Sequence, residues 1–523
     1  MKSTRPAVAV ARGASYLIAS NFATTVISIV AFAFIARLIS REEMGGLAVL
    51  MLIAAGAHLL SDLGLGATTT KFVASFESTG EYDKMRSAGY ECIVANGAAT
   101  LVMAVLVYFS AGLLAPSLLG SVSRTSSIKL LTLEICALGI RNPLSNILTG
   151  LKKFREISIT GVVAFALRQG LVVAFLGLGW GLSGIVIGWG IGDAFNTLVL
   201  AVYTRKFLGP PKLGFGFRKL LKFSAPLFLG NTAGYAWTWF DRALLLPLVS
   251  LAQLGSYNVA VTAYGILNST PSAISGTLFP YYSHFYADGS EVSQTVNLGN
   301  AVRTASRYVS FVTIPLSVGL AVTALPAATL LAGSSYAGAA YPLAILSISL
   351  ALTCQVNALS QIFIVLGKTV TSAGITIASV IVPIFTGILI IPYLGVPGAS
   401  VARGLSLAIS LILSMLVLRR FLQVSFDMEA YGYAWIASLV MAGVVLIAQR
   451  LFYSKYLLPV YVTIGAAVFL IILRFLHAVK PEDFELVSDF LGPRMGHIAR
   501  LLERLLGIRT KASKGTQNHR TPS

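Results

Sequence analysis

Four arginines interrupt long apolar segments of this 523-residue chain, at Arg141, Arg168, Arg242 and Arg403. A charged side chain at the centre of a membrane helix costs at least about 2.5–3.5 kcal/mol, so it should face protein or a wet cavity. A guanidinium stays charged, and its fork of donors matches the oxygens of a phosphate. These arginines are therefore candidates to bind an anionic head group inside the membrane.

A second interpretation stays open, in which each arginine pairs with a buried acid and ties two helices together. The acids that could do so are Glu134, Asp193, Asp241, Asp62 and Glu91. Asp241 and Arg242 are adjacent, so on a helix they point in different directions and do not simply neutralise each other. That pair favours a functional interpretation.

His58 and Asp62 stand four residues apart, on one face of an expected helix. A titrating histidine beside a carboxylate could relay protons or help to bind a cation, and the alternative is a hydrogen-bonded pair within the helix. Candidates for coupling to Na⁺ or H⁺ are Asp241, Asp62, His58, Asp193 and Glu134. We expect no metal site and no cofactor other than such an ion.

Three aromatic residues precede Asp241, namely Tyr235, Trp237 and Trp239. They could stack on sugar rings, although aromatic residues of membrane helices also serve as packing or interface anchors. Gly184, Gly188 and Gly192 recur every four residues, which predicts close packing of two helices. Neither a phosphate-binding Gly-x-x-x-x-Gly-Lys-[Ser/Thr] loop nor a His-Glu-x-x-His motif occurs in the sequence, so an ATPase or a zinc hydrolase is not expected.

The elements that must position these residues are membrane helices. Hydrophobic residues make up 56% of the chain, charged residues only 11%, and the mean hydropathy is +0.80. Apolar runs long enough to cross about 30 Å of hydrocarbon recur throughout, and such spans are helices because lipid offers no partner to open backbone. We expect an all-α polytopic protein with about fourteen spans, at 13–38, 44–66, 88–115, 128–150, 157–178, 181–204, 223–249, 254–281, 304–326, 338–366, 369–391, 394–418, 431–449 and 456–477.

The placement of basic residues predicts the orientation. On this map 29 lysines and arginines lie on the side of the two termini and 6 lie opposite. The positive-inside rule then puts both termini in the cytoplasm of a multi-pass protein of the cell membrane. It also accounts for the net charge of +19 without nucleic acid as a partner.

The chain looks internally duplicated. The segment Arg41-Glu-Glu-Met-Gly-Gly46 is similar to Ser250-Leu-Ala-Gln-Leu-Gly255, and six helices per unit return the chain to the same face. This predicts two parallel six-helix bundles with a transport site between them. The expected parts are a first bundle at 1–205, a cytoplasmic linker at 206–222, a second bundle at 223–420, two further helices at 421–478 and a basic tail at 479–523.

The tail has a helical pattern of its own, with leucines and isoleucine at helical spacing over 498–506 and arginines between them. Such a basic amphipathic helix suits the inner leaflet, so membrane lipids are expected partners. The three cysteines all lie in apolar segments, which indicates packing rather than disulfides or zinc.

The sequence resembles the polysaccharide transporter (O-antigen flippase-like) family of the multidrug/oligosaccharidyl-lipid/polysaccharide exporter superfamily. The resemblance runs over roughly residues 13–420. It is carried by Ala36-Arg37-Leu38 and Gly46, by Ser224-Ala-Pro226, Asp241, Gly255-Ser-Tyr257 and Pro280, and by Gly333-Ser-Ser-Tyr336, Gly367-Lys368 and Ile391-Pro392-Tyr-Leu-Gly395-Val-Pro-Gly398. The chain departs from the family at Ala332, where an aromatic residue is usual.

The resemblance implies two bundles arranged as a V, and it adds Arg37 to the head-group candidates and marks Asp241 as a family position. It implies a transporter rather than an enzyme, which moves a polyprenyl-(pyro)phosphate-linked oligosaccharide to the outer leaflet by alternating access, with glycan-assembly enzymes as candidate partners. The alternative on the same scaffold is a cation-coupled antiporter of drugs or metabolites. A third, a membrane glycosyltransferase, would need a large outer loop, and the expected outer loops are nearly all short.

Overall fold

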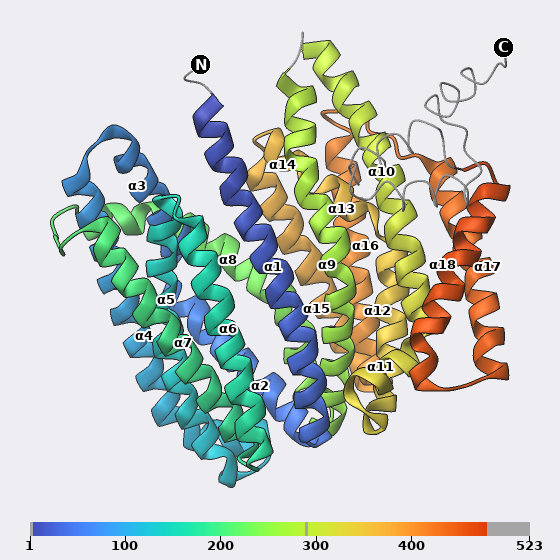
Figure 1. The fold of residues 1–523 in the computed structure, drawn as a ribbon, viewed down its shortest axis with the longest axis horizontal. Helices are drawn as coiled ribbons and strands as arrows, with labels where there is room; N and C mark the ends of the chain where they lie inside the picture. The colour runs from blue at the N-terminus through green and yellow to red at the C-terminus, as the bar shows by residue number, and fades with distance from the viewer. Residues whose placement is uncertain (1–3, 288–290, 479–523) are drawn as a thin grey trace, which may run out of the picture. The chain divides into compact units, whose positions relative to one another are not determined.

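The computed structural model describes residues 4–287 and 291–478, which are organised into helices joined by short turns (Figure 1). The helices up to the middle of the chain are α1 (Thr4–Leu38), α2 (Arg41–Asp62), α3 (Leu65–Thr79), α4 (Tyr82–Leu119), α5 (Thr125–Gly150), α6 (Phe154–Gly177), α7 (Gly181–Leu208), α8 (Phe217–Leu245) and α9 (Leu251–Ala287). The later ones are α10 (Glu291–Val322), α11 (Ala324–Ala332), α12 (Ala340–Leu352), α13 (Gln355–Leu359), α14 (Ile362–Val365), α15 (Thr369–Leu394), α16 (Val396–Leu418), α17 (Met428–Leu451) and α18 (Leu458–Phe475). Three short 3₁₀ turns accompany them, at Val122–Arg124, Ser334–Ala339 and Lys455–Leu457.

The chain is an all-α, multi-pass membrane protein, as the composition predicts. Within the described residues, eleven helical segments are long and apolar enough to cross a membrane. The three remaining expected spans coincide with α5, α8 and α9, which have 26, 29 and 37 residues. The total of fourteen spans stays a prediction, and so does the amphipathic helix of the tail, which lies outside the described residues.

Two expected loops and one expected span differ in the structure. The loop expected at 67–87 is largely the helix α3, which buries Leu65 and Val73 and begins after Leu63 and Gly64 turn the chain with positive φ angles of 51° and 75°. The loop expected at 282–303 is largely the end of α9 and the start of α10. The single span expected at 338–366 is broken into α12, α13 and α14.

Hydrogen bonds to a neighbouring helix stabilise the break between α12 and α13. The side chain of Gln355, the first residue of α13, is buried and donates to Ser310 Oγ at 2.7 Å and to the Ser306 carbonyl at 3.3 Å. Both partners lie on α10. Membrane helices tolerate such interruptions where neighbouring helices satisfy the freed polar groups.

Contacts divide the chain into two compact units. The first holds residues up to Ala260 together with Leu331–Gly338 and Thr376–Ala402, and the second holds Val261–Leu330, Ala339–Ile375 and the residues from Arg403 onward. The sequence-based division into bundles at 1–205 and 223–420 stays a prediction.

In the first unit α5 packs on α4 and α7, and α6 packs on α7 and α1 (Figure 1). The glycine ridge of α7 confirms the predicted close packing. A Cβ at Gly184, Gly188 or Gly192 would lie within 3.0 Å of Phe175, Val172 or Arg168 of α6, respectively. The spacing of four on α7 therefore meets a spacing of three and four on α6, and the helices approach closely because no side chain separates them.

The repeat-related segments also meet in the first unit. Helices α2 and α9 begin alike, because Ser40 caps α2 in a reciprocal pair with Glu43, and Ser250 and Gln253 exchange the same two hydrogen bonds at the start of α9. The hydroxyl of Tyr336 donates to the carbonyl oxygens of Ile39 and Ser40, at 3.3 and 3.2 Å, and so holds the turn that precedes α2.

In the second unit α10 packs on α12, α17 and α18 around an apolar cluster that includes Val309, Met441 and Phe469. A buried ion pair fixes one end of it. Arg307 Nη1 lies 3.4 Å from Asp427 Oδ2, and Arg307 Nη2 donates to the Ala478 carbonyl at 2.6 Å. Helix α10 is thereby tied both to the residue that caps α17 and to the chain that leaves α18.

Candidate functional site

A network of polar side chains crosses the middle of the first unit, within apolar helices. Arg141 of α5 donates to Asp193 of α7, with 2.5 Å between Nη1 and Oδ1. Arg168 of α6 lies 3.4 Å from the other oxygen of Asp193 and 3.8 Å from Glu134 of α5. Its guanidinium also lies 4.9 Å from the centre of the Trp189 ring. Two arginines from neighbouring helices therefore share one aspartate.

The network continues to α2 through a residue that the sequence reasoning missed. Asn142 follows Arg141 and accepts from it at 3.5 Å. The Asn142 amide then lies 2.7 Å from His58 Nε2. We use the word network from here on for the six connected residues His58, Asn142, Arg141, Asp193, Arg168 and Glu134. An asparagine beside an arginine in an apolar segment was the available signal.

Gly192 allows α7 to approach the backbone of α6 closely at Arg168. A Cβ at Gly192 would be only 2.4 Å from Arg168 Cβ and 2.7 Å from its Cα. Any larger residue at 192 would push α6 away from α7, and Asp193 would then lose its contact with Arg168. The predicted ridge thus has a second role, because its last glycine brings the ion pair within reach.

The acids of the network are more deeply buried than the bases. The side chains of Asp193 and Glu134 are 3% and 5% exposed, whereas those of Arg141 and Arg168 are 26% and 20% exposed. Within the described structure, Arg168 Nε, Glu134 Oε2 and Asp193 Oδ2 are buried without a hydrogen bond. The carboxylates therefore form the buried side of the network, and the guanidiniums form its more exposed side.

His58 and Asp62 have separate partners, so the hydrogen-bonded pair considered from their spacing is not what the structure shows. Asp62 Oδ2 accepts from the Asn231 amide of α8 at 3.5 Å, a long contact. His58 binds Asn142 through Nε2, while its Nδ1 is buried and lacks a hydrogen bond among the described residues. His58 thus belongs to the network and Asp62 to the surface between α2 and α8.

Asp241 forms a separate, fully buried group on α8. Its Oδ2 accepts from the Tyr257 hydroxyl at 2.6 Å, and its Oδ1 accepts from the backbone N–H of Arg242 at 2.8 Å. The Arg242 guanidinium stacks on Trp239, 4.5 Å from the ring centre. Trp239 thus packs on a cation in this structure. Tyr257 was noted in the sequence only as a landmark, and the structure makes it the partner of this acid.

The other candidates are spread more widely. Trp237 packs at the edge of the cluster of Phe240, Val380 and Ala402, and the Tyr235 hydroxyl donates to the Leu52 carbonyl at 3.2 Å. Arg37 is an exposed residue in the last turn of α1. Arg403 is buried in the second unit. In the described part of the chain, no group of three or more His, Cys, Asp or Glu side chains could hold a metal ion.

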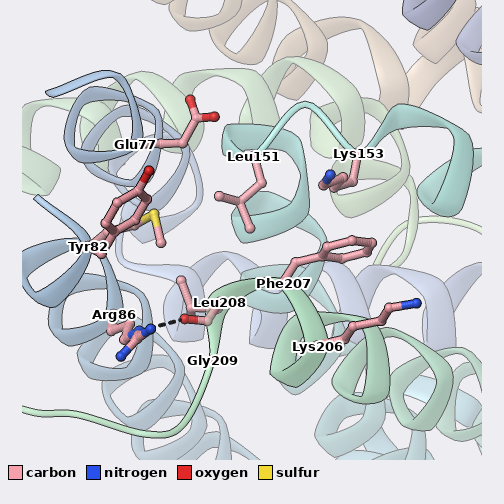
Figure 2. Close-up of a pocket in the computed structure, with 10 residues that line it drawn as sticks. Glu77, Tyr82, Arg86, Leu151, Lys153, Lys206, Phe207, Leu208 and Gly209 are labelled. Atoms are coloured by element: carbon pink, nitrogen blue, oxygen red, sulfur yellow. Dashed lines mark hydrogen bonds between the residues drawn. The ribbon is translucent and has the colours of Figure 1, made fainter. Parts of the chain in front are cut away.

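Two of the cavities in the described part of the chain lie away from the network. One of about 450 Å³, in the first unit, lies at the ends of α3, α4, α6 and α7, and three cations, one acid, and aromatic and aliphatic side chains line it (Figure 2). The other, of about 500 Å³ in the second unit, lies between α10, α17 and α18 and includes Pro315, Met441 and Tyr461. The lining of the second cavity is almost entirely apolar, which suits a hydrocarbon chain rather than a charged group.

Known proteins resemble this chain in sequence and in fold. Residues 10–286 match the family model described as polysaccharide biosynthesis protein. The probable low-salt glycan biosynthesis flippase Agl15 of Haloferax volcanii is 25% identical over 236 residues, which are 43% of this chain and 47% of that protein. The succinoglycan biosynthesis transport protein ExoT of Rhizobium meliloti is 24% identical over 67% of this chain and 68% of its own length. The first of these alignments spans about half of the relative.

Solved structures show the same fold at low sequence identity. The lipid II flippase MurJ in an inward closed conformation aligns with a TM-score of 0.72 and 16% identity, over 88% of this chain and 98% of its own. An inward-facing multidrug resistance MATE family transporter of the MOP superfamily aligns with a TM-score of 0.57 and 15% identity, over 76% of this chain and 94% of its own. These relatives are named as flippases and transporters, which agrees with the prediction that the chain is a transporter rather than an enzyme.

Proposed function

Because the chain belongs to the polysaccharide biosynthesis protein family, a polysaccharide transporter family of the MOP superfamily, we propose that it moves a lipid-linked oligosaccharide from the inner to the outer leaflet of the membrane. The observation that carries the proposal is the network, in which two partly exposed guanidiniums are held by one buried aspartate at the middle of the first unit. No ATP-binding motif accompanies it in the sequence.

The network suits the phosphate or pyrophosphate that joins a glycan to its polyprenyl carrier. A phosphate oxygen approaching from the exposed side meets Arg141 and Arg168 before it meets Asp193. A guanidinium can bind phosphate in a bidentate manner and still keep its contact with the aspartate. Asp193 and Glu134 offset the two positive charges while the site is empty, so the arginines are tolerated in the membrane. Both earlier interpretations of the arginines, as ties and as ligands, are compatible with this arrangement.

The names of the sequence relatives support a glycan as the cargo. One is a probable flippase of glycan biosynthesis and the other a transport protein of succinoglycan biosynthesis. A sugar chain is strongly hydrated and needs a protein-lined path, whereas its polyprenyl tail is stable in lipid. Trp237, Trp239 and Tyr235 remain the proposed surface for sugar rings, and membrane lipids and glycan-assembly enzymes remain the proposed partners.

Alternating access is the mechanism that we propose for this movement. The first turns of α2 and α9 are in close contact at Gly45 and Gly255, and we propose that this contact keeps one end of the transport path closed. The count of basic residues puts that end at the outer face, and the opposite end at the cytoplasm. Release of the glycan outside would then require the contact at Gly45 and Gly255 to open.

Net transport also needs a driving force, and we propose that it is a Na⁺ or H⁺ gradient sensed by buried carboxylates. His58, with a free Nδ1 in the described structure, connects through Asn142 to Arg141 and Asp193. Asp241 is the second candidate, since it is buried and hydrogen-bonded to Tyr257. Translocation that stays unchanged when both gradients are collapsed would exclude this coupling.

The test is translocation in proteoliposomes, read as access of an external glycosidase to a labelled polyprenyl-pyrophosphate oligosaccharide. The variant Arg141→Gln/Arg168→Gln should reduce the rate at least tenfold. Arg450→Gln is the control, because Arg450 is exposed at the end of α17. This variant should translocate the glycan lipid at the wild-type rate. If the wild type moves no glycan lipid but exchanges organic cations for Na⁺ or H⁺, the antiporter alternative replaces the flippase.

A further inference from the structure

The cavity at the ends of α4, α6 and α7 carries three cations that the network does not use. Arg86 comes from α4, Lys153 immediately precedes the first residue of α6, and Lys206 lies in the last turn of α7. Figure 2 shows Phe207 between the two lysines, and their ammonium groups lie 4.3 and 5.7 Å from the centre of that ring. Three separate elements thus contribute positive charge to the lining of one cavity.

These cations are available for a ligand. Within the described chain, none of the three lies within 4.0 Å of a carboxylate. The acid in the cavity wall, Glu77, pairs instead with Lys152 at 3.8 Å. The cavity therefore carries an excess of positive charge that its own wall does not neutralise.

Arg86 is held in place by the end of α7. Its Nε donates to the Leu208 carbonyl at 3.1 Å, the bond drawn in Figure 2. The guanidinium lies against Gly209, where a Cβ would be 2.9 Å from Nε and where φ is +89°. Glycine therefore permits this approach, and the remaining guanidinium donors stay available.

The surroundings of the cavity indicate a lipid. On α7, Leu198 and Val202 are exposed and are followed at the same helical spacing by Lys206. On α6, Ile159 and Val163 form a similar exposed stripe that leads to this end of the helix. Exposed apolar stripes of membrane helices face acyl chains, so the cations at their ends lie at the level of the head groups. The positive-inside count assigns this end to the inner leaflet, where anionic lipids attract basic residues.

From these observations we infer that the cavity binds the phosphate head group of an anionic membrane lipid. The volume of about 450 Å³ exceeds what an inorganic phosphate fills and falls in the range of small-molecule sites. Lys153 and Lys206, which flank Phe207, contact the phosphate, Arg86 adds positive charge on the opposite side of the cavity, and the acyl chains lie along α6 and α7. The site is separate from the network and does not depend on which cargo the protein moves.

The test uses the purified full chain in neutral detergent, titrated with phosphatidylglycerol or phosphatidylcholine and followed by native mass spectrometry and thermal unfolding. Phosphatidylglycerol should bind and raise the Tm, and phosphatidylcholine should do so much less. Lys153→Gln/Lys206→Gln should weaken phosphatidylglycerol binding about 25-fold, since each basic residue near a lipid phosphate contributes a factor of roughly five. Lys153→Arg/Lys206→Arg should keep it.

The matched control is Arg419→Gln/Arg420→Gln, which removes the same charge from two exposed residues after α16 and should bind the lipid like wild type. Equal affinity of the Lys→Gln variant and wild type would overturn the site. If inorganic phosphate raises the Tm as much as phosphatidylglycerol does, the proposal that the ligand is a lipid is wrong, and the cavity binds a soluble phosphate. Because the readouts are binding and unfolding, neither outcome depends on glycan translocation.

Discussion

Gly45 of α2 and Gly255 of α9 pack directly against each other's helices. A Cβ added to Gly255 would lie 2.1 Å from the Arg41 carbonyl oxygen and 2.8 Å from the Gly45 nitrogen, and one added to Gly45 would lie 2.0 Å from the Leu251 carbonyl oxygen. The contact is reciprocal, and it joins the two segments whose similarity indicated an internal duplication.

The first prediction follows from that contact. Gly255→Ala should destabilise the protein by about 1–3 kcal/mol, because backbone carbonyls cannot move aside as a flexible side chain would. The measurement is thermal unfolding in detergent. Gly112→Ala is the control, since no atom lies within 4 Å of that position on α4, and it should be neutral or slightly stabilising. Equal stability of the two variants would contradict the tight contact.

The second prediction concerns the aspartate shared by two arginines. Asp193→Ala should cost about 3–5 kcal/mol of stability, because it leaves Arg141 and Arg168 without their common partner. The triple variant with Arg141→Gln and Arg168→Gln should recover part of the loss. Thermal unfolding of the single, double and triple variants measures the coupling. If the losses simply add, the residues do not interact energetically as the distances indicate.

The third prediction tests whether glycine positions Arg168. Gly192→Ala should lower the stability by about 1–3 kcal/mol and also slow glycan-lipid translocation, because α6 must move away from α7. Gly170→Ala on α6, with no atom within 4 Å, is the matched control for both measurements. Normal translocation and stability of Gly192→Ala would show that the two helices can separate without effect on the network.

The fourth prediction concerns the ion pair of the second unit. Asp427→Ala should destabilise the protein by about 3–5 kcal/mol, because it leaves the buried Arg307 without this carboxylate. It also removes the cap of α17, where Asp427 accepts a hydrogen bond from the Ala430 N–H at 3.0 Å. Hydrogen exchange should rise first at the start of α17. Glu429→Ala, an exposed acid two residues further on, should have little effect. If hydrogen exchange at the start of α17 stays slow in Asp427→Ala, the cap is not needed to hold that end of the helix.

The sequence by itself determined the helical membrane fold, because so apolar a chain has no other way to satisfy its backbone in lipid. It also indicated that the arginines at 141 and 168 should face protein or a wet cavity, and it named Asp193 and Glu134 among the acids that could pair with them. The ridge of Gly184, Gly188 and Gly192 was readable as well, since a spacing of four on a helix marks one face whatever packs on it.

The tertiary structure decided which groups meet. Arg141 and Arg168 share Asp193 across three helices, and Asn142 connects them to His58, although nothing in the spacing of these residues selects those pairs. Arg307, Lys153 and Lys206 contributed to the sequence analysis only as three of the 29 basic residues on the side of the termini. Their roles depend on how separate helices are placed side by side, which local periodicity does not encode.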